Sequence, residues 1–295
     1  MKPASFEYAR AADLDDACAL LAQGDDVRVI AGGQTLVPLM AMRLARPTML
    51  VDISRIASLS YVRDDGDAVT IGATTRQCVV EHDPLLRAKI PLLAKALPFV
   101  GHAPTRARGT IGGSLANADP AAEIALVAVT LGATLTYREG RASKNIPADQ
   151  FFTGPMMTVL PAAACLAAVS FPVWHGERVG AGFAEVSARK SDFAFASAAA
   201  QVELDDDGTC RRIVLGVGAI TPAPLRLDGF AAALTGKRIA EAPAHEAVTA
   251  ALAGVEPMAD LYASAEYRRR AAVSLAVRAI MDAVCAAQAR GAHAR

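Results

Sequence analysis

The 295-residue sequence predicts an α+β fold, with a mixed strand and helix region of about 175 residues followed by a smaller domain. Three observations predict this fold class. Short apolar runs that end at glycine alternate with segments of helical spacing. Two pairs of apolar runs flank Asp-Gly turns, as the strands of antiparallel hairpins do. A stretch that contains proline and glycine, at 172–182, marks a domain boundary.

The first elements are a short helix and a set of strands. Apolar residues recur at helical spacing between positions 14 and 21, and residues 27–31 form an apolar run that ends at a glycine pair. Residues 48–54 form a second strand-like run. Residues 59–63 and 68–73 flank the turn Asp64-Asp65-Gly66-Asp67, which predicts a hairpin.

The middle of the chain is mainly helical. Residues 83–99 are rich in leucine and predict partial helix despite two prolines, and the following sixteen residues, GHAPTRARGTIGGSLA, read as a glycine-rich loop. Asp119 is a good N-cap and Pro120 a good first helical residue, so a helix is predicted to resume there and to end at Gly132. Two further strands are predicted, at 133–138 and 164–171.

The smaller domain begins with a predicted strand pair. Residues 196–204 and 212–219 flank an Asp-rich turn at 205–208. Three helical segments complete the chain, at 227–235, 243–254 and 264–289.

Composition excludes several classes of protein. Thirty basic and thirty acidic residues give a formal net charge of zero, which argues against a nucleic-acid partner. No uninterrupted apolar run reaches the ~18 residues that a membrane span needs. The N-terminal MKPASFEYAR has no signal-peptide core, so we expect a cytoplasmic protein. The five cysteines are scattered without a CxxC pair, which argues against a metal or iron–sulfur site on this chain.

Two glycine loops are candidate phosphate-binding segments. Ala31-Gly32-Gly33-Gln34-Thr35 follows a predicted strand, and Thr110-Ile111-Gly112-Gly113-Ser114 precedes a predicted helix. Paired glycines let a backbone approach a phosphate, and successive N–H groups form an anion-binding nest. The alternative is that each pair is only a tight turn. Neither loop has the P-loop or the Rossmann glycine pattern.

Two acidic residues near the second loop suit a different task. Asp119 and Glu123 would repel a phosphate at the helix N-terminus, but they can accept hydrogen bonds from ribose hydroxyls or an adenine amino group. The alternative for Asp119 is a plain N-cap.

Three segments resemble the flavoprotein family of the molybdenum hydroxylases, in order and spacing over essentially the whole chain. This family includes the medium subunits of carbon monoxide dehydrogenase and quinoline oxidoreductase and the flavin domain of xanthine dehydrogenase. AGGQTLVPLMAMRLARP, at 31–47, resembles the first FAD motif, and RARGTIGGSLANADPAAE, at 106–123, resembles the second. The segment 187–194, SARKSDFA, is similar to the family's basic–Asp–aromatic signature.

The resemblance implies a fold with two FAD-binding subdomains of the vanillyl-alcohol-oxidase (PCMH) type and a C-terminal α+β domain of the carbon monoxide dehydrogenase flavoprotein type. The implied FAD-binding domain spans 1–176, with subdomains of about 1–57 and 58–176, and the C-terminal domain spans 177–295.

The resemblance also implies a set of FAD contacts. The first motif would surround the pyrophosphate, the second would bind its other side, Leu166 would touch the flavin ring, and Phe193 would cover one face of it. The alternative for Phe193 is an ordinary core aromatic. The implied cofactor-binding residues are Ile30, Ala31, Gly32, Gly33, Gln34, Thr35, Leu36, Val37, Thr110, Ile111, Gly112, Gly113, Ser114, Asn117, Asp119, Glu123, Leu166 and Phe193.

The implied role is electron transfer. A large partner subunit with a molybdenum-pterin cofactor would hydroxylate a small substrate, for which quinoline oxidoreductase suggests an N-heterocycle. A small partner would pass electrons through [2Fe-2S] clusters to FAD on this chain, and FAD would reduce an external acceptor. The implied assembly is a dimer of heterotrimers, with no catalytic residue and no metal site on this chain. A stand-alone FAD-dependent oxidoreductase and a non-catalytic nucleotide-binding module remain as alternatives.

Overall fold

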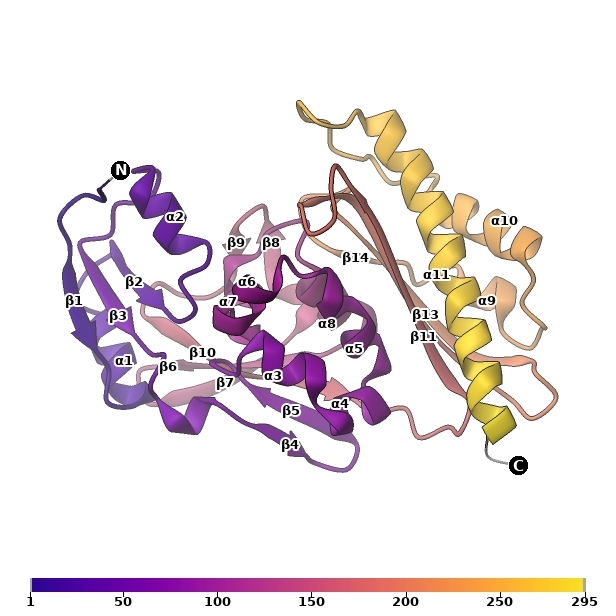
Figure 1. The fold of residues 1–295 in the computed structure, drawn as a ribbon, viewed down its shortest axis with the longest axis horizontal. Coiled ribbons are helices and arrows are strands. Elements are labelled where there is room, and N and C mark those ends of the chain that lie inside the picture. Colours follow the sequence, from indigo (N-terminus) through magenta and orange to yellow (C-terminus); the bar gives the residue numbers. More distant parts are fainter. Residues whose placement is uncertain (1, 294–295) are drawn as a thin grey trace.

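The computed structural model describes residues 2–293, and its three larger β-sheets lie in a row along the long axis of the molecule (Figure 1), with a small antiparallel pair, β8-β9, in addition. A parallel sheet has the order β1-β3-β2, an antiparallel sheet β4-β5-β10-β6-β7, and a second antiparallel sheet β11-β12-β13-β14. The strands are β1 Glu7–Arg10, β2 Val27–Ile30, β3 Met49–Asp52, β4 Val62–Asp64, β5 Ala68–Gly72, β6 Thr134–Glu139, β7 Ala142–Pro147, β8 Phe152–Gly154, β9 Met157–Thr158, β10 Ala164–Pro172, β11 Val179–Ser187, β12 Ala194–Leu204, β13 Cys210–Gly218 and β14 Leu225–Arg226.

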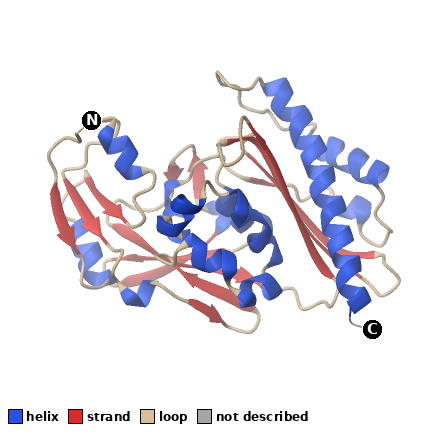
Figure 2. Ribbon diagram, viewed as in Figure 1, coloured by secondary structure: helices blue, strands red, loops and turns tan. Residues whose placement is uncertain are grey.

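Helices cover and separate these sheets (Figure 2). Three short 3₁₀ turns, at 57–59, 97–99 and 148–150, accompany them. The α-helices are α1 Leu14–Leu21, α2 Leu36–Ala41, α3 Gln77–His82, α4 Pro84–Lys89, α5 Pro91–Ala96, α6 Ala103–Arg108, α7 Ile111–Asn117, α8 Glu123–Leu131, α9 Ala231–Leu234, α10 Glu241–Leu252 and α11 Ala265–His293.

The helix α1 forms as its apolar spacing predicts. Asp13 caps it by accepting a hydrogen bond from the Asp16 N–H at 2.9 Å, and the helix buries Ala17, Cys18 and Leu21. Both predicted hairpins are also confirmed, since β4 pairs with β5 and β12 pairs with β13 in antiparallel register.

The helix α8 is the central element of the fold. All of its residues from Ile124 to Leu131 are buried, because it lies between the five-stranded sheet and the C-terminal sheet. Gly132 ends it with φ +69°, a left-handed conformation that glycine adopts without strain. The C-terminal sheet therefore packs on α5 and α8 with one face and on α11 with the other (Figure 1).

Two predictions about the segment before α8 are wrong. The segment predicted as a loop contains α6 and α7, and Gly112 and Gly113 lie in the first turn of α7. The next helix starts at Glu123 rather than at Pro120, because the Asp119 carboxylate caps a turn by accepting from the Ala121 N–H at 2.9 Å. Residues 118–122 therefore form a non-helical connection between α7 and α8.

The long helix α11 is apolar and long enough to cross a membrane by length and composition alone. The structure gives its apolar residues another role, because Ala279, Ile280 and Ala283 are fully buried in the C-terminal core. Gly180 and Gly182 of β11 let this helix approach closely, since a Cβ at either position would collide with the α11 backbone.

Candidate functional site

A cavity of about 590 Å³ lies between β2, the helices α6 and α7 and the loop that follows β11, a size typical of sites for small molecules and cofactors. Four stretches line it, together with Gln77 of α3. Residues 28–36 come from β2 and the loop into α2, and residues 100–110 come from the α6 region. Residues 113–123 belong to α7 and its connection to α8, and residues 191–193 belong to the loop between β11 and β12.

The first glycine loop has the properties of an anion-binding nest. Within the described residues, the backbone N–H groups of 32–36 have no protein acceptor. Gly33 has φ +70°, which a residue with a side chain rarely adopts. A Cβ on Gly32 would lie 2.5 Å from the Arg108 carbonyl oxygen, so only glycine lets this loop touch the α6 end. The free N–H groups therefore face the cavity as donors for phosphate oxygens.

The second glycine loop is not a nest, and this part of the prediction is wrong. Its amides are already bonded within the protein: the N–H of Ile111 to Thr75 O at 3.0 Å and that of Gly112 to Ala73 O at 2.9 Å. The Gly113 N–H donates to the Thr110 hydroxyl at 3.0 Å, which caps α7. Gly112 is required for packing, because its Cβ would lie 2.5 Å from the Ala73 Cβ.

The cavity lining includes all of the predicted cofactor-binding residues except Val37, Ile111, Gly112 and Leu166. Val37 is 50% exposed on the outer face of α2. Ile111 and Leu166 are buried in the main hydrophobic core, and Gly112 packs on Ala73. Binding of FAD by the other residues stays a prediction.

Asp119 and Glu123 form an acidic wall of the cavity where α8 begins. Burial raises the pKa of Glu123 to about 7, and the nearby Asp119 adds to the rise. Burial also raises the pKa of Asp119, which the Ala121 N–H opposes. Behind this wall, burial and the charge of Glu123 raise the pKa of Glu185, on β11, to about 8. The carboxyl groups of Glu123 and Glu185 can therefore donate as well as accept hydrogen bonds near neutral pH.

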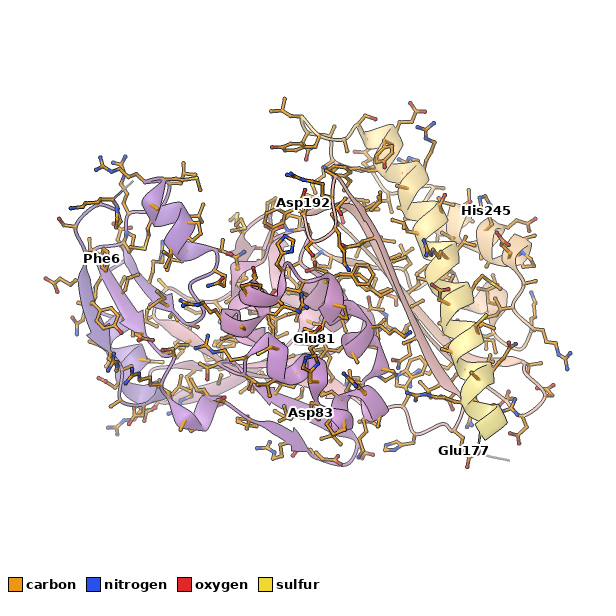
Figure 3. All side chains as sticks on the ribbon, in the orientation of Figure 1. Phe6, Glu81, Asp83, Glu177, Asp192 and His245 are labelled. Atoms are coloured by element: carbon orange, nitrogen blue, oxygen red, sulfur yellow. The ribbon has the colours of Figure 1, made fainter. Side chains whose placement is uncertain are left out.

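One wall of the cavity was not predicted from the sequence: Val100, Gly101, His102 and Thr105 line it at 100–105. Arg106 fixes this wall through its guanidinium. It pairs with Glu81 of α3 at 2.7 Å and donates to the Gly101 carbonyl at 2.8 Å (Figure 3). Both side chains are 13% exposed, so the pair is shielded from solvent. The signal that could have indicated this wall is Arg106, one of two arginines in a segment that was predicted as loop.

The loop between β11 and β12 places Phe193 at the cavity. Phe193 is 75% exposed, which excludes the interpretation of an ordinary core aromatic. Its neighbour Asp192 pairs with Arg189 at 3.1 Å within the same loop, and Ser191 takes a left-handed conformation with φ +70° (Figure 3).

Comparison with known families covers nearly the whole chain. Residues 4–174 match the family described as "FAD binding domain in molybdopterin dehydrogenase", and residues 181–283 match "CO dehydrogenase flavoprotein C-terminal domain". The chain is an FAD-binding medium subunit of the molybdenum hydroxylase family. The predicted fold class and the predicted FAD cofactor are thereby confirmed.

Individual relatives share this medium subunit's full length. It is 35% identical to the 6-hydroxypseudooxynicotine dehydrogenase complex subunit alpha of Paenarthrobacter nicotinovorans, with 96% of each chain covered. A carbon monoxide dehydrogenase structure from Hydrogenophaga pseudoflava superposes with a TM-score of 0.92 at 32% identity, covering 97% of this chain and 99% of that one. Quinoline 2-oxidoreductase from Pseudomonas putida 86 gives a TM-score of 0.92 at 33% identity, with the same coverage.

In this medium subunit, Phe193→Ala is expected to change the flavin absorbance more than the amount of FAD retained. The aromatic ring would contribute stacking at the cavity, whereas the free N–H groups of the first loop would carry most of the binding. The measurement is the difference spectrum of the assembled complex before and after FAD removal, which cancels iron–sulfur absorbance. Phe6→Ala, on the far side of the molecule, is the control (Figure 3). An unchanged spectrum in Phe193→Ala would refute the shielding role.

Proposed function

We propose that this medium subunit relays electrons from [2Fe-2S] clusters of a small partner subunit, through its FAD, to an external acceptor. Hydroxylation of the substrate would occur on a large partner subunit with a molybdenum-pterin cofactor. The observation that carries the proposal is the cavity, in which the backbone N–H groups of 32–36, which have no acceptor among residues 2–293, meet hydroxyl, amide and carboxyl side chains. This donor set fits a dinucleotide with a central pyrophosphate.

Different residues of the chain would bind different parts of FAD. The N–H groups of 32–36 would bind the pyrophosphate, and the Ser114 hydroxyl and Asn117 amide would extend this contact from α7. Asp119 and Glu123 would bind ribose or adenine, and Phe193 would limit access of water to the flavin ring. The bound flavin supplies the chemistry that joins two-electron and one-electron transfer, and the protein supplies position and electrostatics. No residue of this chain is assigned to the hydroxylation.

The substrate class in the proposal is an N-heterocyclic aromatic. Quinoline 2-oxidoreductase supports it by name, while carbon monoxide dehydrogenase has the same TM-score. Turnover assays of the assembled complex with quinoline-type and pyridine-type heterocycles and with carbon monoxide separate these classes. Oxidation of carbon monoxide alone would refute the heterocycle proposal.

The proposed assembly is a dimer of heterotrimers in the cytoplasm. Expression of this chain with its genomic neighbours, followed by purification through a tag on this chain, tests the assembly. We expect a large and a small subunit to co-purify, with one FAD per medium chain released on denaturation. A tagged chain that oxidises a small molecule without partners would instead support a stand-alone oxidoreductase. Absence of FAD from a complete complex would refute the proposal.

A further inference from the structure

Arg268 is a buried cation in the first turn of α11, at the end of the C-terminal sheet that faces the cavity. Only 3% of the residue is exposed. One terminal nitrogen, Nη1, donates to the Phe195 carbonyl at 2.6 Å and to the Ala219 carbonyl at 2.7 Å. The other, Nη2, pairs with the Asp260 carboxylate at 2.5 Å. A single guanidinium therefore joins three segments that are distant in the sequence.

The two carbonyl groups belong to segments that reach different walls of the cavity. Phe195 lies at the start of β12, two residues after Phe193. Ala219 follows β13, and its N–H donates to the Pro120 carbonyl at 2.9 Å, between Asp119 and Glu123. Arg268 is thus bonded on one side to the strand that carries the Phe193 loop and on the other to the residue that binds the acidic wall.

Asp260 keeps the guanidinium in this orientation. Its Oδ1 accepts from the N–H groups of Tyr262 and Ala263, each at 2.9 Å, so the carboxylate is fixed by its own loop. The N–H groups of Ala263 and Tyr262, followed by Arg268, lower the pKa of Asp260, which therefore stays ionised at neutral pH. The Tyr267 ring packs edge-on against Phe195, with centroids 6.4 Å apart, and supports the same strand end.

We propose that Arg268 is a positioning residue for the flavin, which sets the separation between the Phe193 loop and the acidic wall at 119–123. This inference rests on the proposed function, because it assumes that FAD lies between those two walls. A lysine cannot replace the arginine, since an ammonium group lacks the planar fork that reaches two carbonyl groups and a carboxylate together.

The adjacent Arg269 provides a matched control. It donates to the Leu252 carbonyl at 2.8 Å and to the Val255 carbonyl at 2.5 Å, at the end of α10, and lines no part of the cavity. Arg268→Lys and Arg269→Lys therefore each disrupt the contacts of one arginine to two backbone carbonyl groups, in the same turn of α11. Only the contacts of Arg268 are to segments that lead to the cavity.

The test compares both variants in the assembled, FAD-loaded complex. We expect Arg268→Lys to accelerate FAD release by roughly tenfold or more, the equivalent of one charge-assisted hydrogen bond. The FAD difference spectrum and the flavin midpoint potential should also shift. Arg269→Lys should lower the Tm of the complex while both flavin signals stay at their wild-type values. Asp260→Asn, which retains the carbonyl contacts, should shift the flavin signals in the same direction by less.

Three outcomes would overturn the inference. Arg268→Lys could lower the Tm with unchanged flavin signals, which would make Arg268 purely structural. Equal flavin changes in both arginine variants would show general loosening of the domain. If the complex with Arg268→Lys does not assemble, Asp260→Asn is the remaining test. Flavin signals at wild-type values in that variant would also refute the inference. A wild-type complex without FAD is a different result, because it refutes the proposed function.

Discussion

Replacing Gly32 with alanine is expected to lower the FAD content of the purified medium subunit while the chain still folds. The added Cβ would lie 2.5 Å from the Arg108 carbonyl oxygen and 2.9 Å from the Gly109 Cα, both of which are backbone atoms. The loop at 31–35 would have to move away from the α6 end, and its N–H groups would turn from the cavity. Overpacking of this kind costs about 1–3 kcal/mol, which weakens FAD binding by roughly ten- to a hundredfold.

The control for this prediction is Gly24→Ala, in the same subdomain. The Cβ of that variant would meet only the Val27 side chain, at an ordinary 3.8 Å. FAD released from each purified complex is measured against protein concentration, with Tm as the readout of folding. Full FAD occupancy in Gly32→Ala would mean that the first loop is not the phosphate site.

The second large effect is expected from Glu185→Gln, through the pH dependence of stability. Glu185 Oε2 is buried and has no hydrogen-bond partner within the described residues. Burial, followed by the charge of Glu123, raises its pKa from 4.5 to about 8. A raised carboxyl pKa means that the folded chain binds more protons than the unfolded chain. Stability is therefore complete below about pH 4.5 and falls as the pH rises towards 8.

Glutamine keeps the shape of the protonated acid and removes the titration. The variant should match the wild type near pH 4.5 and exceed it by about 2 kcal/mol at pH 8, a value reduced for the solvent screening of a partly exposed carboxyl. Unfolding of the purified chain in urea across this pH range measures the difference. Glu177→Gln, at an exposed position in the same domain, should leave the pH profile unchanged. A constant difference between wild type and Glu185→Gln at all pH values would contradict the assigned ionisation.

Sequence patterns predicted the elements whose apolar residues face one core. The runs at 27–31 and 164–171 became β2 and β10, and the longest predicted helix became α11. The glycine pair after β2 was also informative, because the backbone N–H groups of 32–36 have no acceptor in the described part of the chain.

The helices and strands that were not predicted from the sequence are those in which glycine allows a neighbouring segment to pack closely. The strand β11 was not predicted, and its first residues were assigned to a domain boundary, because Gly180 and Gly182 weaken the strand signal. Those glycines are needed where α11 crosses the sheet. α7 was predicted as loop for the same reason, since Gly112 packs on Ala73 and Gly113 leaves room for the Thr110 cap. A single sequence does not distinguish a glycine that binds a ligand from one that admits a neighbouring backbone.

The Arg268 contacts were also beyond sequence-based prediction. Phe195, Ala219 and Asp260 are separated by long stretches of chain, and two of the contacts are to backbone carbonyl groups that any residue type provides. In the sequence, Arg268 is one of three consecutive arginines at 268–270, and nothing in the charge pattern distinguishes it from the other two. Burial at 3%, known only from the structure, distinguishes it from the others.

The most direct test of the electron-relay account is rapid mixing of the assembled complex with its reducing substrate. Two preparations are compared, one complete and one without the molybdenum-pterin cofactor. If the medium subunit relays electrons, substrate should reduce the flavin of the complete complex only, while dithionite should reduce the flavin of both. Reduction of the flavin by substrate at equal rates in the two preparations would contradict electron relay, because it would place substrate oxidation on the medium subunit.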